Sequence, residues 1–173
     1  ESSEPVSVTV DPLPFRPGKP KGDDNLCAGT TSSDFTTSGA LYAESDEYQW
    51  SLYPDTAGTV TGTSTSATVT WNSLFSGSAW LKVRGHNGCG YGEYSDSILV
   101  TIHSAPQVNI GPDSTVCKGY VLDAGNPGAS FLWNTGSTSQ TISVNHSGTY
   151  YVTVTSNNGC VGTDSAQITV SEP

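Results

Sequence analysis

The chain has 173 residues, with 16 acidic and six basic side chains, and a formal net charge of −10. Such a surface repels a phosphate backbone, so we expect no nucleic-acid partner. The sequence lacks a run of about 18 apolar residues, which excludes a transmembrane helix within it, so we expect no membrane insertion. It does not open with a basic start and an apolar core, so we expect any export signal to lie outside these residues.

The composition is typical of β-structure. Gly 19 and Pro 10 indicate frequent turns, and the apolar residues are mostly branched or aromatic and stand in short alternating runs. No stretch of ten or more residues has apolar side chains at helical spacing. We therefore predict an all-β fold.

The first predicted strand is residues 5–10, and it has two interpretations. It resembles the later segments 98–102 and 167–170, so it either closes a preceding domain or forms the first strand of this one. We assign residues 1–14 to the last strand of a preceding domain or a linker, residues 15–103 to a first domain and residues 104–173 to a second.

The next informative strand is residues 79–84, whose alternation separates its side chains. Ala79, Leu81 and Val83 take one face, so Trp80 shares the other face with Lys82 and Arg84 and meets water. An outward Trp80 is a candidate to stack on a sugar or a neighbouring chain. Alternatively, its ring packs on Lys82 or a nearby loop. Tyr151 takes the matching place later in the chain, which makes it the second candidate.

The chain contains an internal duplication. Segment 77–83 parallels segment 148–154, the Asn-Gly-Cys at 87–89 parallels that at 158–160, and each copy closes on an alternating strand, at 97–102 and 166–170. The first copy has extra length between Cys27 and Trp71.

Each copy has a cysteine, then a tryptophan, then a second cysteine, which is the order of an immunoglobulin-like β-sandwich. With no Cys-x-x-Cys pair, the cysteines indicate disulfides rather than zinc. Of three pairings we choose Cys27–Cys89 and Cys117–Cys160, because each bond stays within one repeat. We expect one disulfide per domain, Trp50 and Trp133 in the cores, and a location outside the reducing cytoplasm.

Several blocks resemble a known family. Residues 48–52, 56–62 and 67–71 are similar to the PKD-like, Ig-like repeats of large surface proteins from Bacteroidetes, and residues 109–117, 122–129 and 132–136 to a sister repeat of the same proteins. The resemblance implies tandem Ig-like (PKD-like) sandwiches in the extracellular stalks of adhesins, gliding-motility proteins and polysaccharide-degrading enzymes, exported by the type IX secretion system. It supplies no catalytic residues.

Glycosylation is a further implication of that resemblance. Bacteroidetes are known for O-linked sugars at Asp-(Ser/Thr)-x triplets in which x is a small or aliphatic residue or Thr, and four such triplets occur here. The candidate acceptors are Thr56, Ser97, Ser114 and Ser165.

The sequence contains few residue patterns that indicate catalysis or cofactor binding. No Gly-x-Ser-x-Gly turn exists and the three histidines lie near predicted turns and strand ends, so we expect no enzyme, no catalytic residue and no cofactor. A structural calcium ion held by acidic loops is the exception among cofactors, but such loops also simply solubilise a surface, so we predict no metal site. Its candidate ligands are Asp23, Asp24, Asn25, Glu44, Asp46 and Glu47.

We predict a monomeric, non-catalytic extracellular module that acts as a spacer or presenting repeat in a large bacterial cell-surface adhesin-type protein. Its partners are then the neighbouring domains of the same chain. The alternative is a carbohydrate-binding accessory module of a secreted polysaccharide-degrading enzyme, favoured by Trp80 and Tyr151. A third hypothesis, a repeat that binds a cell-surface protein, stays open because adhesive specificity resides in variable loops.

Overall fold

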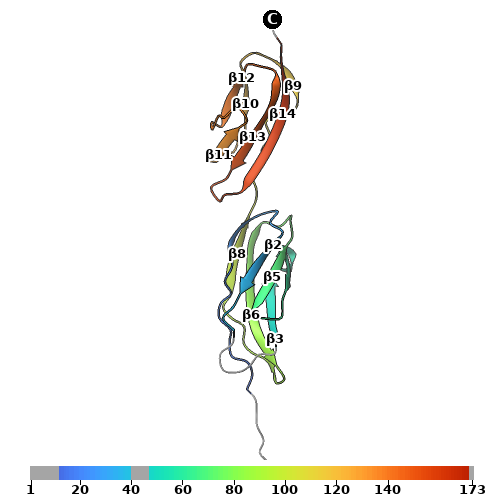
Figure 1. Ribbon diagram of the computed structural model, residues 1–173, viewed down its shortest axis with the longest axis vertical. Helices are drawn as coiled ribbons and strands as arrows, with labels where there is room; N and C mark the ends of the chain where they lie inside the picture. Colours follow the sequence, from blue (N-terminus) through green and yellow to red (C-terminus); the bar gives the residue numbers. More distant parts are fainter. Residues whose placement is uncertain (1–11, 40–46, 172–173) are drawn as a thin grey trace, which may run out of the picture. The chain divides into compact units, whose positions relative to one another are not determined.

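The computed structural model describes residues 12–39 and 47–171 (Figure 1). Their regular elements are β-strands and one 3-10 turn, η1 (Asp55–Ala57), so the all-β prediction is confirmed. The chain divides into two compact units, Glu1–Ile102 (unit 1) and His103–Pro173 (unit 2). Within the described ranges no helix has the length and apolarity needed to cross a membrane.

Unit 1 is built from two sheets (Figure 1). Alternating side chains on both sheets leave one apolar face each, and the two faces pack together because that removes them from water. One sheet has the order β1 (Asn25–Cys27), β8 (Ile98–His103), β6 (Gly77–Asn87), β3 (Glu47–Tyr53), with β7 (Gly90–Tyr91) also paired to β6. The other has the order β2 (Ser32–Thr36), β5 (Ser66–Trp71), β4 (Gly58–Thr61).

Unit 2 repeats this plan with fewer strands (Figure 1). Val152, Val154 and Ile168 come from its larger sheet and pack against Leu122 and Val144 of the smaller one, forming a core of its own. The larger sheet has the order β11 (Ser130–Trp133), β13 (Gly148–Thr155), β14 (Val161–Ser171), β9 (Ser114–Cys117). The smaller one pairs β10 (Tyr120–Asp123) with β12 (Thr141–Val144).

The two predicted core tryptophans are confirmed. Trp50 on β3 and Trp133 on β11 are 7% and 2% exposed. Each indole N–H donates to a backbone carbonyl, at 3.0 Å to Ser64 and 2.8 Å to Ser139. These bonds satisfy the one polar atom of each ring, so the whole side chain can be buried without leaving an unpaired donor.

The segment before β1 packs against unit 1. Pro14, Pro17 and Pro20 are buried while most residues between them are exposed, a period of three that matches an extended polyproline-type chain. Asn87 Nδ2 donates to the carbonyl of Pro12 at 2.9 Å. Residues 12–14, which the sequence assigns to a preceding domain or linker, therefore contact this unit. Residues 1–11 of that predicted segment lie outside the described part.

The predicted cysteine pairing is wrong. Cys89 and Cys117 carry exposed free thiols, so neither Cys27–Cys89 nor Cys117–Cys160 is formed. Cys27 and Cys160 are the disulfide-bonded cysteines. Each unit thus lacks the internal disulfide expected from one bond per repeat.

The strand register explains this correction in unit 2. β9 runs parallel to β14, with Cys117 beside Ser171 at the end of β14, whereas Cys160 immediately precedes its first residue, Val161. Eleven residues of extended chain span more than about 30 Å. The Cα atoms of a disulfide lie only about 4.4–6.8 Å apart.

Unit 1 shows the same separation. Thr101 donates to the carbonyl of Asp24 at 2.8 Å and faces Ser78 near the start of β6, so β1 and Cys27 belong to that end of the sheet. Cys89 lies in the turn that follows Asn87, at the other end of β6. The matching Asn-Gly-Cys motifs are therefore alike in sequence without marking bonded partners.

Thiol mapping tests this assignment. Alkylation of the native, unreduced protein followed by peptide mapping is expected to modify Cys89 and Cys117, and to reach Cys27 and Cys160 only after reduction. Because the two free thiols are exposed, Cys89→Ser and Cys117→Ser should each change the free energy of unfolding by less than about 0.5 kcal/mol. Protection of all four cysteines before reduction would contradict the assignment.

The core role of Trp133 has its own test. Trp133→Ala should lower the free energy of unfolding of unit 2 by about 3–5 kcal/mol, because a large buried side chain leaves a cavity. Denaturant titration measures the change. Tyr151→Ala is the matched control on the same sheet: its ring is exposed, so the expected change is within about 0.5 kcal/mol. Equal losses in the two variants would show that Trp133 is not a core residue.

Candidate functional site

The outer face of the larger sheet in unit 1 carries the first predicted ligand-facing aromatic. Ala79, Leu81 and Val83 of β6 are fully buried, as the alternation predicts. Trp80 consequently points away from the core and is 42% exposed. It is an outward tryptophan on a central strand, with β3 on one side and β8 on the other.

Trp80 stands in an apolar row that crosses three strands. It lies directly opposite Tyr53 on β3 and directly opposite Leu99 on β8. Both neighbours are exposed, Tyr53 at 69%. The rings of Tyr53 and Trp80 have centroids 6.3 Å apart and are tilted by 39°. Three exposed apolar side chains thus form one continuous platform on the sheet surface.

The next two outward positions of β6 are cations held against aromatic rings. The Lys82 ammonium lies 4.2 Å from the centroid of the Tyr94 ring. The Arg84 guanidinium lies 4.0 Å from the Tyr91 centroid and 4.6 Å from that of Tyr94. Cation–π attraction at these distances orders both side chains and keeps their charge at the surface.

Polar groups on β3 flank these cations. Gln49 and Ser51 lie directly opposite Arg84 and Lys82. Gln49 Oε1 accepts a hydrogen bond from Arg84 Nε at 2.7 Å and one from the Tyr94 hydroxyl at 3.4 Å. We name Tyr53, Trp80, Lys82, Arg84, Tyr91 and Tyr94 the aromatic–cation row.

The charge of this face differs from that of the chain. Among the outward-facing residues of β3, β6 and β8 that the structure describes, Glu47 is the one carboxylate, whereas Lys82 and Arg84 are two of the six basic residues. These three strands thus carry two cations and one carboxylate on their outer face, whereas the segment after β7 adds the exposed Glu93 and the Arg16–Asp96 pair. At physiological salt, charges more than about 8 Å from a bound ligand are largely screened. The charges nearest Trp80, Lys82 and Arg84 therefore determine the electrostatic attraction at this face.

Tyr151, the second predicted aromatic, has different surroundings. It points outward from β13 in unit 2, is 52% exposed, and lies opposite Ser165 of β14. Asn134 donates its backbone N–H to the Tyr151 carbonyl at 3.0 Å and accepts from the Tyr151 N–H through Oδ1 at 3.2 Å. Trp80 and Tyr151 therefore belong to different units, and each has its own neighbours.

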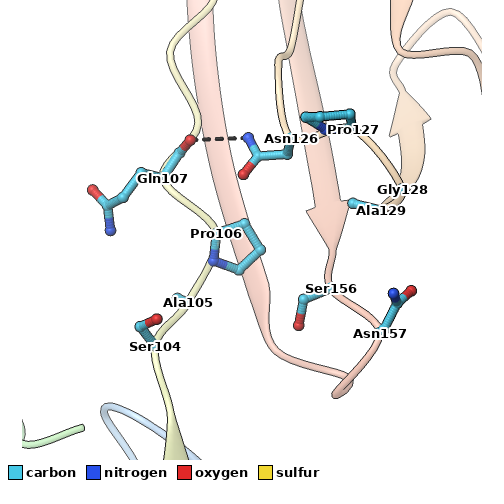
Figure 2. A pocket seen from close by; sticks show the side chains of 10 residues that line it. All are labelled: Ser104, Ala105, Pro106, Gln107, Asn126, Pro127, Gly128, Ala129, Ser156 and Asn157. Carbon is cyan, nitrogen blue, oxygen red and sulfur yellow. Dashed lines mark hydrogen bonds between the residues drawn. The ribbon is translucent and has the colours of Figure 1, made fainter.

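Unit 2 also has a shallow groove of about 420 Å³. Figure 2 shows Asn126 reaching toward the backbone of Gln107, to whose carbonyl its Nδ2 donates at 2.9 Å. The groove has no charged side chain in its lining. It can offer ligands hydrogen bonds and small apolar contacts only. Its lining is Ser104, Ala105, Pro106, Gln107, Asn126, Pro127, Gly128, Ala129, Ser156 and Asn157.

The four candidate glycosylation acceptors occupy distinct settings. Thr56, Ser97 and Ser165 are exposed, whereas Ser114 is half-buried and donates to the carbonyl of Pro112 at 2.9 Å. Three of the preceding aspartates have structural partners. Asp96 pairs with Arg16, Asp113 accepts from the Gln167 N–H, and Asp164 accepts from the Ile110 N–H.

Where the structure describes them, the histidines and acidic residues lie apart from one another rather than in one site. In the part of the chain that the structure describes, no three His, Cys, Asp or Glu side chains converge as a metal site would require. Glu44 and Asp46, two of the proposed calcium ligands, lie outside that part. His86 stacks on Tyr91 with centroids 4.3 Å apart, and His103 Nδ1 lies 3.1 Å from Asn158 Nδ2.

Sequence reasoning missed several members of the aromatic–cation row. Tyr53 was accessible to it, because Trp50 faces inward and alternation along β3 then turns Tyr53 outward. Its position beside Trp80 depends on the β3–β6 register, which the sequence does not reveal. Tyr91 lies on the two-residue strand β7, opposite His86 of β6, and Tyr94 lies in the irregular segment that follows. Neither segment has a periodic pattern, so nothing in the sequence places the two rings beside Lys82 and Arg84.

Comparison with solved structures gives a likeness in fold. A crystal structure of a C-terminal 282-residue fragment of intimin, in complex with the intimin-binding domain of the translocated intimin receptor, matches 88% of this chain with a TM-score of 0.59 and 14% identity. The chain spans 64% of that fragment. The FN1–FN3 domains of chicken CNTN1 match 91% of this chain and 67% of theirs, at 15% identity and a TM-score of 0.41.

Comparison of the sequence with proteins of curated function finds no match. A family model described as PKD-like domain matches residues 13–100, a range that contains the paired sheets, the buried Trp50 and the aromatic–cation row of unit 1. That match covers just over half of the 173 residues, and the chain therefore belongs to the PKD-like domain family.

Proposed function

We propose that this chain is a non-catalytic extracellular module that spaces or presents other domains of a large bacterial cell-surface adhesin-type protein. Membership of the PKD-like family supports the proposal, because families of this kind are typically non-catalytic modules. The disulfide-bonded state of Cys27 and Cys160 favours a location outside the reducing cytoplasm. From the sequence resemblance we further propose a Bacteroidetes source and type IX export.

The observation that carries the proposal is that the interior of both units is almost entirely apolar. Among the described residues, Ser95 is the one buried polar side chain, and it donates to the carbonyl of Asp96 and accepts from the Val83 N–H. Catalytic groups usually lie where burial and neighbouring charges shift their pKa. The pKa of the exposed Asp123 carboxyl lies below its ordinary value, because the Gln140 amide and the Gly125 N–H donate to it. Those hydrogen bonds order a turn, and they stabilise the ionised Asp123 carboxylate rather than a group that exchanges a proton near neutral pH.

The likeness to the intimin fragment adds a fold-level argument. That protein was crystallised with a receptor domain. At 14% identity the likeness concerns the fold alone, so it supports a surface-module architecture without transferring a binding partner.

Replacement of the segment tests the spacer function. In the full-length surface protein that contains these residues, deletion of 12–171 is expected to impair adhesion or display. Substitution by two unrelated β-sandwich domains of similar length should restore it, because a spacer contributes length and stiffness rather than specific contacts. A replacement that fails as completely as the deletion would overturn the proposal and assign a specific binding role to the chain.

A second function is proposed from one specific observation, the exposure of Trp80 and Tyr151 on the outer faces of two sheets. Exposed aromatic rings offer planar apolar faces on which a sugar ring can stack. We propose, as the alternative, a carbohydrate-binding accessory module of a secreted polysaccharide-degrading enzyme.

A glycan and polysaccharide screen tests this alternative. If Trp80 holds the sugar, Trp80→Ala should weaken binding about tenfold or more, since stacking on the ring is lost, while Tyr151→Ala leaves it unchanged. The reverse pattern would locate the site on β13 of unit 2. A screen without binding, together with tryptophan fluorescence that polysaccharides leave unchanged, would remove the alternative.

A further inference from the structure

We infer that the aromatic–cation row of unit 1 is a binding surface for an acidic polysaccharide, in which sugar rings stack on Tyr53 and Trp80 and their carboxylates pair with Lys82 and Arg84. This inference rests on the second function proposed above. It deepens that function by naming one unit, one face and one class of glycan.

The first argument is the ordering of apolar and cationic groups along β6. Trp80, Lys82 and Arg84 occupy successive outward positions and span about 13 Å at strand rise. An apolar platform therefore adjoins two positive charges on one face of the sheet. A uronic acid polymer has the complementary order, because each ring offers an apolar C–H face and carries a carboxylate at its edge.

The second argument is the fixed position of the charges. Lys82 and Arg84 lie over the rings of Tyr94 and Tyr91, and Arg84 also donates to Gln49. Side chains already held in place lose less conformational entropy when a ligand binds. Each retains N–H groups beyond those engaged, because an ammonium has three and a guanidinium five.

The third argument concerns the kind of partner. β6 is hydrogen-bonded to β3 and to β8 in the stretch that carries Trp80, so its backbone has no groups left for an added peptide strand. A partner that lies over Trp80, Lys82 and Arg84 is therefore recognised by side chains, because strand addition is confined to the edges of the sheet, such as β3. Flat rings flanked by Gln49, Ser51 and two cations suit stacked sugar rings with hydroxyl and carboxylate groups better than they suit a peptide backbone.

Charge complementarity favours an acidic glycan over a neutral one. Two of the six basic residues of a chain with net charge −10 lie on this face, opposite the uncharged Ser51 and Gln49. A neutral glycan would leave both cations without a counter-charge in the complex, whereas a carboxylate forms charge-assisted hydrogen bonds with them.

A matched pair of polymers provides the test. Isothermal titration calorimetry of the whole chain is performed with polygalacturonate and with its carboxyl-reduced form, in which each carboxylate is a neutral alcohol. We expect polygalacturonate to bind at least about tenfold more tightly, with an affinity that falls as salt increases. Lys82→Gln combined with Arg84→Gln should abolish that preference and the salt dependence. Trp80→Ala should weaken the binding of both polymers, whereas Tyr151→Ala should leave the binding of both unchanged.

The outcomes separate this inference from the function on which it rests. Equal binding of both polymers would overturn the acidic specificity and leave glycan binding standing. Binding of neither would overturn both. Binding of poly-glutamate as tight as that of polygalacturonate would overturn the glycan assignment in favour of an acidic protein surface. Thermal unfolding of each variant, unchanged from the parent chain, excludes loss of folding as the cause.

Discussion

The pairing of β6 with a strand on either side is the constraint on which the rest of unit 1 depends. With its hydrogen-bonding edges engaged by β3 and β8, the strand stays extended and its side chains must alternate. The inward set, Ala79, Leu81 and Val83, closes the core against the second sheet. The outward set is then fixed as well, so the stability of the sandwich and the exposure of Trp80 have one cause.

Because of this alternation, the residues that stabilise the fold and the residues available for binding lie on opposite faces of the sheet. Residues on the inner face are constrained by packing, because any change of volume there is felt by the core. Residues on the outer face contribute little to stability and are free to serve binding. A module of this kind can carry different surfaces on the same frame, which is why its family membership establishes a fold and leaves the ligand to be argued from the surface.

The two units illustrate this freedom. Both bury a tryptophan whose indole donates to a serine carbonyl, and both place an aromatic residue at the matching outward position of the neighbouring strand. In unit 1 that residue has Tyr53, Leu99 and two cations around it. In unit 2, Tyr151 lies opposite Ser165, and the outer face around it carries threonines and the exposed Leu132, with no charged side chain directly opposite Tyr151. The repeat preserved the core and allowed the surfaces to diverge.

The sequence alone determined the β class, the outward Trp80 and the buried Trp50 and Trp133, because strand alternation and the duplicated pattern are local properties of the chain. Only the tertiary structure decided which residues meet across strands. The Tyr53–Trp80 pair depends on the β3–β6 register. The Tyr91 ring depends on the pairing of β7 with β6, and the Tyr94 ring on the path of the irregular segment after β7. The cysteine pairing failed for the same reason: sequence similarity placed Cys117 and Cys160 in one repeat, but the register of β14 separates them by the length of a strand.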